Sequence, residues 1–521
     1  MELSRRKLLV AAGAAAAAVP AAHAAQDPSL SDNVPKKWDR TVKLLIVGAG
    51  GAGLTAAVSA AQNGLTDTLI LEKMAYIGGN TAISGGGMNA VDPARQKAQG
   101  IEDSIENHYE QTLKGGDYRA NPALVKELVE NAPETVTWLE SIGMKFKDKV
   151  YQVYGSLYPR GHAPLGSLGQ DYIKVLVDQC KKYGIPIEKQ ARVVRIIRET
   201  PLKGKVLGVE YEKGGKLITV RATKAVVVAA GGFGANKKMR ALHDPRLADL
   251  TTTNHPGATG DLLPLMVDVG ADLTGMDFIQ CNPGCPPGRT HRVPLHQGGR
   301  FIIVDRNGKR FIREDERRDV IRDAVLIQPK ATAWGILDQT RFDMINQGQK
   351  DAAYKGLETG DAWKADTIEE LAKKMGLPPA ALKATVDEFN AGVKAGKDKL
   401  GKYQRNLFPI EKPPFWGAYV GMSVHHTMGG VVINTAAEVI DRRGEIIPNL
   451  YAAGEVTGGI HGANRLGGNA IADCLTFGRL VGKEIAEKKA CMIDAQSESG
   501  PDVTIWIIVS SRTCVLGRYL S

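Results

Sequence analysis

A glycine motif that follows an apolar run constrains the fold of this chain more than any other feature. Residues 42–47 are apolar, and residues 48–53 follow them with the spacing G-x-G-x-x-G. Small residues at 54–63 predict a helix, and the apolar run 68–71 predicts a second strand that ends at Glu72. Strand, glycine turn, helix and strand in this order predict a βαβ unit of the kind that binds dinucleotides.

Each glycine of this motif has a separate expected role. Gly48 forms the tight turn, Gly50 lets the backbone approach a pyrophosphate, and Gly53 allows the helix to pack closely on the strand. The free N–H groups at the start of the helix favour the phosphates. Glu72 is placed to accept hydrogen bonds from ribose hydroxyls, and no nearby arginine suits the 2′-phosphate of NADP.

Glycine is abundant throughout the chain, with 59 among 521 residues. The glycines do not form Ser/Gly linker tracts but gather between apolar runs, at 48–53, 78–87, 231–234, 257–260, 298–299 and 454–468. Such clusters indicate loops whose backbone approaches a ligand closely, since glycine has no Cβ. The sequence also predicts helices at 120–139, 170–184, 367–375, 379–392 and 470–488, a hairpin at 206–221 and a buried strand at 225–230.

The first 25 residues have the composition of an export signal. Arg5 and Arg6 precede an alanine-rich apolar run that ends in Ala22-His23-Ala24, a small-residue cleavage site. Paired arginines are typical of twin-arginine signals, so we expect a folded cargo delivered to the periplasm. The alternative is a membrane anchor, but residues 8–22 fall short of the roughly 20 that a spanning helix needs. No permanent anchor is therefore expected.

Charge and cysteine spacing exclude several classes of partner. The net charge of +10 favours an anionic substrate or an acidic redox partner. Nucleic acid is not expected, because the chain carries an export signal and lacks a basic stripe with interleaved aromatic residues. The six cysteines form no C-x-x-C or C-x-x-C-H motif, which predicts neither a metal site nor attached haem. Cys281 and Cys285 are left open as a disulfide or as two buried thiols.

Four further motifs carry a family resemblance: residues 78–86 (GGNTAISGG), 253–261 (TNHPGATGD), 425–430 (HHTMGG) and 453–470 (AGEVTGGIHGANRLGGNA). Together they resemble the soluble fumarate reductase and flavocytochrome c group of the succinate dehydrogenase–fumarate reductase flavoprotein superfamily, with urocanate and methacrylate reductases as relatives. The resemblance covers about 41–488. It implies an α/β fold in which a Rossmann-like FAD-binding domain, residues 41–277 and 404–490, is interrupted by an α+β capping or clamp domain, residues 278–403. Residues 491–521 are unassigned.

The resemblance implies non-covalently bound FAD and hydride transfer from flavin N5 to a carbon–carbon double bond. FAD is long, so several separate loops must touch it. The residues expected to bind it are Gly48, Gly50, Gly53, Glu72, Lys73, Gly79, Asn80, Thr81, Ser84, Gly86, Gly231, Gly232, Asp261, Gly454, Glu455, Asn469, Ala470 and Ile471.

Three side chains are expected to act on the substrate. Arg465 offers a planar fork for a carboxylate, and His425 adds a hydrogen bond and charge. In the resembled family these positions hold one substrate carboxylate, and Arg318 aligns with the family's general acid, an arginine. Asn282 and Gly260 are added as substrate-binding residues.

The chain also departs from the family pattern. Asn282 stands where fumarate reductases carry a histidine for the far carboxylate, and Val293 and Pro294 stand where they carry a Thr-Glu pair. We therefore expect a monocarboxylate, or a substrate with a neutral or aromatic far end, rather than fumarate. No haem motif is present, which predicts a separate periplasmic c-type cytochrome as donor in anaerobic respiration. A ketosteroid-dehydrogenase-like desaturase and a flavoprotein electron carrier are the alternatives.

Overall fold

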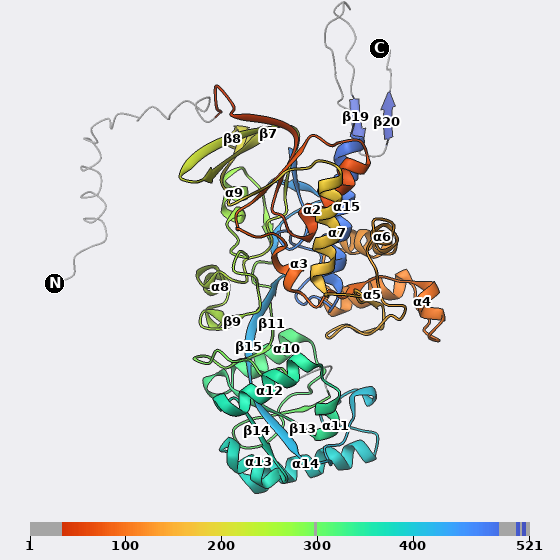
Figure 1. Cartoon of the computed structure of the whole chain (residues 1–521), viewed down its shortest axis with the longest axis vertical. Helices are drawn as coiled ribbons and strands as arrows, with labels where there is room; N and C mark the ends of the chain where they lie inside the picture. Colours follow the sequence, from red (N-terminus) through yellow and green to blue (C-terminus); the bar gives the residue numbers. More distant parts are fainter. Residues whose placement is uncertain (1–33, 296–299, 489–506, 511–512, 517–521) are drawn as a thin grey trace, which may run out of the picture.

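The computed structural model describes residues 34–295, 300–488, 507–510 and 513–516. Figure 1 shows two lobes stacked along the long axis of the molecule. The strand β15 (Phe415–Thr427) runs from the lower lobe into the upper one, and β11 (Ile279–Gly284) pairs with it in antiparallel fashion. These two strands join the lobes.

The helices of the described chain are α2 (Gly51–Gln62), α3 (Gly79–Ile83), α4 (Pro93–Lys97), α5 (Ile105–Gly115), α6 (Pro122–Ser141), α7 (Gly169–Lys182), α8 (Lys237–His243), α9 (Leu262–Asp268), α10 (Arg318–Leu326), α11 (Gln339–Asp343), α12 (Gln347–Thr359), α13 (Ile368–Met375), α14 (Pro379–Lys394) and α15 (Asn469–Glu487). The strands besides β11 and β15 are β1 (Arg40–Val47), β2 (Thr68–Glu72), β3 (Met88–Asn89), β4 (Gly161–His162), β5 (Ile187–Lys189), β6 (Arg192–Thr200), β7 (Lys203–Lys213), β8 (Lys216–Val228), β9 (Thr251–Thr252), β10 (Leu273–Thr274), β12 (Ile302–Val304), β13 (Ala333–Leu337), β14 (Ala362–Ala365), β16 (Gly430–Val431), β17 (Glu438–Ile440), β18 (Ile446–Ala452), β19 (Ile507–Ser510) and β20 (Thr513–Leu516).

The upper lobe is built on an eight-stranded sheet with the order β17-β18-β8-β1-β2-β5, to which β7 and β6 are joined at β8. Strand β1 is parallel to both β2 and β8, and β18 is parallel to β8. Parallel strands of this kind place their carboxyl ends at one edge, where α/β folds bind ligands. The expected α/β fold is therefore confirmed, with antiparallel strands at one side of the sheet.

Glycine decides how the first βαβ unit packs. Gly48 has φ +109°, and a Cβ there would overlap the carbonyl oxygen of Ala229 at the end of β8. A Cβ at Gly53 would overlap the carbonyl oxygen of Gly48, so the helix α2 lies directly on the turn. The predicted strand–turn–helix–strand unit is confirmed, and it requires glycine at these two positions.

Most other predicted elements are present with small shifts at their ends. The helices expected at 120–139, 170–184 and 470–488 are α6, α7 and α15. The hairpin β7–β8 is longer than predicted, and the strand expected at 225–230 is the end of β8 rather than a separate strand. Since β8 continues through the hairpin into the sheet, the two predicted elements are one.

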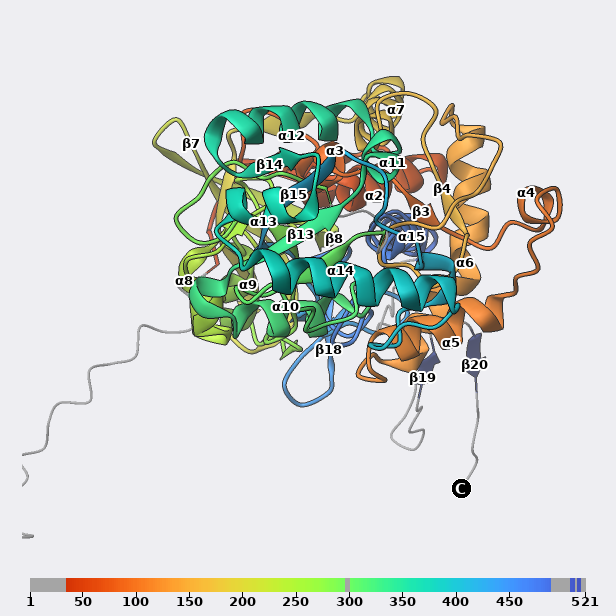
Figure 2. The same ribbon diagram turned by 90° about the horizontal axis from the view of Figure 1, so that it is seen from below.

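The lower lobe holds a second sheet with the order β11-β15-β13-β12, and β14 and β9 also pair with β15. Trp416 on β15 stacks on Phe342 of α11, with ring centroids 3.8 Å apart, whereas Phe415 packs into a separate core with α13 and α14. Figure 2 shows α12 and α14 on opposite sides of β13 and β14. The predicted domain limits, 278 and 403, stay predictions; β15 lies after residue 403 and still pairs with β13 and β14.

Two predictions concern the ends of the chain. The predicted export signal, residues 1–25, lies outside the described residues. In the unassigned segment 491–521, β19 pairs with β20 in antiparallel fashion. Within the described ranges, no helix combines the length and apolar character needed to cross a membrane.

Candidate active site

A cavity of about 460 Å³ opens at the carboxyl ends of the parallel strands of the upper lobe and extends to β11 and α10. Its lining includes most of the residues predicted from the sequence: Gly48, Gly50, Glu72, Lys73, Gly79, Asn80, Thr81, Ser84, Gly86, Gly231, Asp261, Asn282, Arg318, His425, Gly454, Glu455, Arg465, Ala470 and Ile471. The fold thus brings together positions from 48 to 471 around one space.

The end of the cavity next to β1 and β2 is formed by the glycine turn and Glu72. The Glu72 carboxylate accepts hydrogen bonds from the backbone N–H groups of Ala49, at 2.9 Å, and Met74, at 2.8 Å. Lys73 forms an ion pair with Asp261 at 2.7 Å. Glu72 therefore also holds the turn after β1, in addition to the ribose contact that its position predicts.

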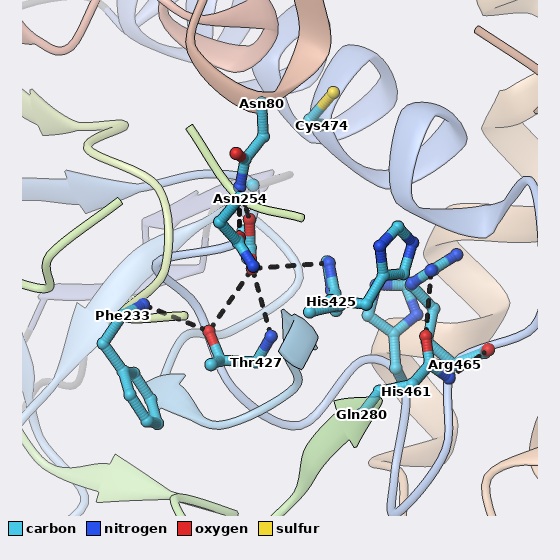
Figure 3. A network of polar contacts seen from close by, with 12 residues as sticks. Asn80, Phe233, Asn254, Gln280, His425, Thr427, His461, Arg465 and Cys474 are labelled. Atoms are coloured by element: carbon cyan, nitrogen blue, oxygen red, sulfur yellow. Dashed lines mark hydrogen bonds and ion pairs between the residues drawn. The ribbon is translucent and has the colours of Figure 1, made fainter. Parts of the chain in front are cut away.

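A polar network forms the wall behind this end (Figure 3). The amide of Asn80 donates to Asn254 at 2.7 Å and to the Glu455 carboxylate at 2.9 Å. Glu455 also accepts from the backbone N–H of Thr427 at 3.0 Å. Burial raises the pKa of Glu455. The network ties α3 to the start of the glycine-rich segment after β18.

Four predicted site residues are not among those that line the cavity: Gly53, Gly232, Gly260 and Asn469. A Cβ at Gly232 would overlap the Thr427 hydroxyl, and a Cβ at Gly260 would lie 2.7 Å from that of Phe233. The absence of a Cβ therefore lets Gly232 pack against Thr427 and Gly260 pack against Phe233. Asn469, which is fully buried at the start of α15, donates to the Thr112 hydroxyl at 3.1 Å.

Two buried guanidinium groups dominate the opposite end of the cavity. Arg318 donates to the side-chain oxygens of Gln280, at 3.1 Å, and Asn282, at 3.2 Å, and to the backbone carbonyl of Tyr154, at 2.9 Å. Arg465 donates to the same Gln280 oxygen at 2.9 Å. In Figure 3, a dashed line marks this hydrogen bond between Arg465 and Gln280.

In the part of the chain that the structure describes, neither guanidinium forms an ion pair with a carboxylate, and the Nε atoms of Arg318 and Arg465 are buried without a hydrogen-bond partner. By contrast, the neighbouring Arg317 forms an ion pair with Asp319 at 2.9 Å. Buried cations are normally paired, because leaving water is costly. This end is therefore suited to an anionic ligand.

Burial and mutual repulsion alter the titration of these groups. Burial lowers the pKa of Arg318, and burial together with the charge of Arg318 lowers the pKa of Arg465 to about 9. Burial and the two arginines hold the pKa of His425 well below its usual range. In this arrangement the lowered pKa favours a neutral His425, and its part in substrate binding stays a prediction. Its Nδ1 lies 2.7 Å from the Thr253 hydroxyl, so a neutral imidazole is positioned at the cavity.

Comparison with known proteins identifies the family. A model described as an FAD binding domain matches residues 43–471. The chain belongs to this FAD-binding family. It is 38% identical over 452 residues to a fumarate reductase (cytochrome) of Shewanella frigidimarina, covering 86% of this chain and 77% of that protein. It is also 34% identical over 496 residues to the acrylate reductase flavoprotein subunit of Shewanella woodyi, covering 91% and 97%.

A solved structure agrees with this assignment. The open conformation of a flavocytochrome c3 fumarate reductase superimposes with a TM-score of 0.71 at 35% identity, covering 93% of this chain and 81% of that one. The resemblance inferred from the motifs is therefore confirmed, as are FAD as the cofactor and the assignment as an FAD-dependent oxidoreductase.

The cavity itself fits the cofactor of the FAD-binding family. Gly231 has φ +74°, and a Cβ there would meet no atom within 4 Å, so it would project into open space. At Gly50 the nearest atom to such a Cβ would be the Gly78 oxygen at 3.9 Å. Both glycines line the cavity, which leaves their backbone open to a bound group. That Gly48, Gly50 and Glu72 hold the ADP half of FAD stays a prediction, and their place in the lining is compatible with it.

Sequence reasoning missed three side chains of this FAD-binding protein. Gln280 bridges the two arginines, Tyr154 lies under Arg318 with its ring centroid 5.3 Å from the guanidinium carbon, and Arg292 lines the cavity and donates to the Pro283 carbonyl at 3.1 Å. Gln280 lies two residues before Asn282 in the sequence, but its role depends on pairing opposite His426 across β11 and β15. Spacing along the chain contains no signal for Tyr154 or Arg292.

The open question on cysteine is also answered. Cys281 and Cys285 are free buried thiols, and burial raises the pKa of Cys281 to about 12. Cys281 lies in β11 and Cys285 directly follows it, so an extended chain separates them by roughly 13 Å, too far for a disulfide. Across the described ranges, no group of three or more His, Cys, Asp or Glu residues is arranged to hold a metal ion.

Proposed function

We propose that this protein is an exported, FAD-dependent reductase of the carbon–carbon double bond of an α,β-unsaturated carboxylate. The observation that carries the proposal is the pair of buried guanidinium groups that line the cavity, Arg318 and Arg465, which both donate to the Gln280 oxygen and keep unpartnered Nε atoms. A carboxylate between them restores the missing counter-charge. The relatives named fumarate reductase and acrylate reductase support the same chemistry.

Bound FAD supplies the hydride, and the side chains prepare the substrate to receive it. Arg465 and the neutral His425 hold one carboxylate and stabilise the negative charge that develops on it as the hydride reaches the β-carbon. Arg318 then donates a proton to the α-carbon. An arginine is a weak acid, but burial lowers the pKa of Arg318, and its three neutral partners hold the guanidinium in place. The group that returns the proton to Arg318 is unassigned.

The substrate class is proposed from Asn282. Its side-chain oxygen accepts from Arg318, which leaves the uncharged amide N–H₂ as the group available to a ligand in the cavity. Such a donor suits a carbonyl, a hydroxyl or a ring nitrogen, but it supplies no positive charge to a second carboxylate. We therefore propose a monocarboxylate, or an acid with a neutral or aromatic far end, rather than fumarate.

Arg292 favours a second candidate, a dicarboxylate. It lines the same cavity, and its positive charge helps to lower the pKa of the nearby His425. Fumarate reductases carry a histidine at the position of Asn282, and the guanidinium of Arg292 is able to replace it as the charged partner of a second carboxylate. The two candidates differ in one measurable way, because only the dicarboxylate requires Arg292 as a charge partner.

Oxidation of reduced methyl viologen by purified, FAD-loaded protein tests the reaction and the substrate class. The panel is acrylate, methacrylate, urocanate and fumarate, each with the native protein and with Arg292→Met. We expect a monocarboxylate or urocanate to have the highest kcat/KM and to lose little in Arg292→Met. If fumarate is the best substrate and Arg292→Met raises the KM for fumarate tenfold or more, the dicarboxylate candidate replaces the monocarboxylate candidate. No turnover with any unsaturated acid overturns the proposed function.

Location and electron supply complete the proposal. The paired arginines of the N-terminal segment support twin-arginine export to the periplasm, and the absence of haem motifs from the sequence supports a separate c-type cytochrome as donor. The protein then acts as a terminal reductase in anaerobic respiration. Fractionation of cells that produce the chain, with Arg5→Lys plus Arg6→Lys as the control, tests the location: the native chain is expected in the periplasm and the variant in the cytoplasm.

The two alternatives predict different behaviour of the reduced protein. A ketosteroid-type desaturase removes hydrogen from a ketone, which needs no carboxylate site such as Arg465 and Arg318. In that case unsaturated acids leave the dithionite-reduced flavin unoxidised. For an electron carrier without a substrate of its own, Arg318→Ala and Arg465→Ala change no activity. If an unsaturated acid reoxidises the reduced flavin, and Arg318→Ala loses this reaction, both the desaturase and the electron carrier are excluded.

A further inference from the structure

Four large apolar side chains are exposed around one side of the cavity: Ile83 (57%), Tyr151 (39%), Leu165 (59%) and Leu168 (53%). Ile83 and Tyr151 also line the cavity. Soluble proteins scatter single apolar residues over their surface, but a group beside a functional cavity indicates a contact site.

These side chains belong to segments that are hydrogen-bonded to one another. The N–H of Gly169, directly after Leu168, donates to the Ser84 carbonyl, directly after Ile83, at 3.2 Å. The N–H of Leu165 donates to the Lys145 carbonyl at 2.9 Å, and Tyr151 exchanges backbone hydrogen bonds with Gly161. Figure 1 shows the two helices involved, α3 and α7, side by side. The four residues therefore lie on segments that the backbone holds next to one another.

The loop that carries Leu168 is held in a strained conformation. Leu168 has φ +58°, which is uncommon for any residue other than glycine. The Asp171 carboxylate accepts from the backbone N–H groups of Gly166, at 2.9 Å, and Ser167, at 2.8 Å, and so fixes the loop. A strained backbone that presents an exposed leucine is a feature that folding alone does not require.

Lysines border this apolar surface. Lys145, Lys147 and Lys149 alternate along an exposed segment that pairs with residues 161–165, and none of the three has an ion pair among the described residues. Within residues 145–151 and 161–171 the acids are Asp148, which is exposed, and Asp171, whose carboxylate accepts from the loop backbone. The free charge of this border is therefore mainly positive. The four apolar residues and the three lysines are called the donor face below.

We infer that the donor face is the docking surface for an acidic redox protein that delivers electrons to FAD. The inference rests on the proposed function, because it requires FAD in the cavity and an external donor. Two electrons from the donor and one proton from solvent convert FAD to its reduced form, and the donor loses the same two electrons. An apolar centre with a charged border suits a short-lived complex, since the charges speed the encounter and the apolar contact orients the partners.

Charge reversal tests the inference directly. The variant Lys145→Glu, Lys147→Glu, Lys149→Glu is compared with a control of equal charge change on the lower lobe, Lys309→Glu, Lys373→Glu, Lys397→Glu, whose three lysines are exposed and have no ion pair in the described chain. Stopped-flow absorbance measures reduction of bound FAD by reduced flavodoxin, an acidic probe. It also measures oxidation of the reduced protein by ferricytochrome c from horse heart, a basic probe.

We expect the donor-face variant to react about tenfold more slowly with flavodoxin at low ionic strength, and faster with ferricytochrome c, with both effects shrinking as salt is added. The control variant is expected to change either rate by less than about twofold. The double variant Leu165→Ser with Leu168→Ser is expected to lower the rate of electron transfer with both protein probes at every salt concentration. Equal flavodoxin rates in the donor-face and control variants overturn the inference.

Reduction of FAD by dithionite shows whether each variant still binds a working cofactor. The two proposals fail in different ways, since FAD reduction by flavodoxin needs no unsaturated acid. If the protein reduces no acid but the donor-face variant still loses flavodoxin reactivity, the docking inference stands and the proposed function falls. If acids are reduced with viologen but all variants react alike with flavodoxin, the proposed function stands and the docking inference falls.

Discussion

At the scale of single residues, the arrangement of Arg318, Arg465 and Gln280 concentrates charge where water is excluded. One amide oxygen accepts from both guanidinium groups, at 3.1 and 2.9 Å, and holds two like charges close together. Burial lowers the pKa of both cations, and the charge of Arg318 lowers the pKa of Arg465 further. A bound carboxylate relieves this repulsion, so the site is arranged for an anion before the anion arrives.

Removal of the proposed acid is expected to separate binding from chemistry. In Arg318→Ala we expect kcat for the best unsaturated acid to fall by about 10²–10⁴, the usual contribution of a general acid, with a smaller change in KM. Viologen-linked steady-state turnover measures the loss, and dithionite reduction of FAD in the same variant serves as the control. A kcat within tenfold of the native value contradicts the role of Arg318.

The pH dependence follows from the lowered pKa values. Arg465 is charged below its pKa of about 9 and neutral above it, so kcat/KM is expected to fall as the pH rises through about 9. His425 stays neutral because its pKa lies well below its usual range, so kcat/KM is expected to be flat between about pH 6 and 8. Arg465→Lys is expected to move the alkaline limb to lower pH, since lysine loses its proton more readily. An unchanged alkaline limb in that variant argues against Arg465.

At the scale of elements, close packing of α15 on α2 positions the glycine turn. Gly478 and Gly482 of α15 face α2, and a Cβ at either would meet a backbone oxygen, that of Ala52 or Ala56. The two helices therefore approach at backbone distance. Since α2 begins at Gly51, beside the turn, and α15 begins at Asn469, shortly after the buried Arg465, this contact ties the two ends of the cavity together.

Substitution at this contact tests its contribution to stability. We expect Gly482→Ala to destabilise the protein by about 1–3 kcal/mol, because the added Cβ overlaps the Ala56 oxygen. The matched control is Gly348→Ala in α12, where the nearest atom to the new Cβ is the Asn346 oxygen at 3.6 Å, so the change is neutral or stabilising by about 0.5–1 kcal/mol. Thermal unfolding of both variants measures the difference. Equal midpoints contradict the packing argument.

The secondary-structure elements also show which features can be predicted from the sequence. The βαβ unit is readable because strand, Gly48-x-Gly50 and helix follow one another within a short segment, where local chemistry decides the structure. The roles of Gln280 and Arg292 are not readable in this way. They depend on the register of β11 with β15 and on the path of a loop, both set by contacts between residues that are far apart in the sequence.

At the scale of the whole molecule, the cavity is lined by residues from both lobes. Its lining runs from Val47 at the end of β1 to Cys474 on α15, and the lower lobe adds Arg318 from α10. A ligand that fills this space binds only the folded arrangement. Ligand binding therefore stabilises the whole protein by mass action.

FAD is accordingly expected to raise the unfolding temperature. Protein stripped of FAD should unfold at a lower temperature, and added FAD should restore the midpoint in a concentration-dependent way, with about 2.7 kcal/mol of stabilisation at a hundredfold excess over Kd. Differential scanning fluorimetry, with NADP at the same concentrations as the control, measures the shift. A midpoint that is independent of FAD, or that rises equally with NADP, is incompatible with the assigned cofactor.

The sequence by itself determined the cofactor and the class of fold, because dinucleotide binding depends on glycines at a local spacing and on a βαβ unit that forms within about 30 residues. Only the tertiary structure decided the chemistry of the substrate end. There, burial makes His425 neutral, leaves Arg318 and Arg465 without carboxylate partners, and brings in Gln280, Tyr154 and Arg292. Burial and charge coupling depend on what folds around a side chain, and sequence spacing does not contain that information.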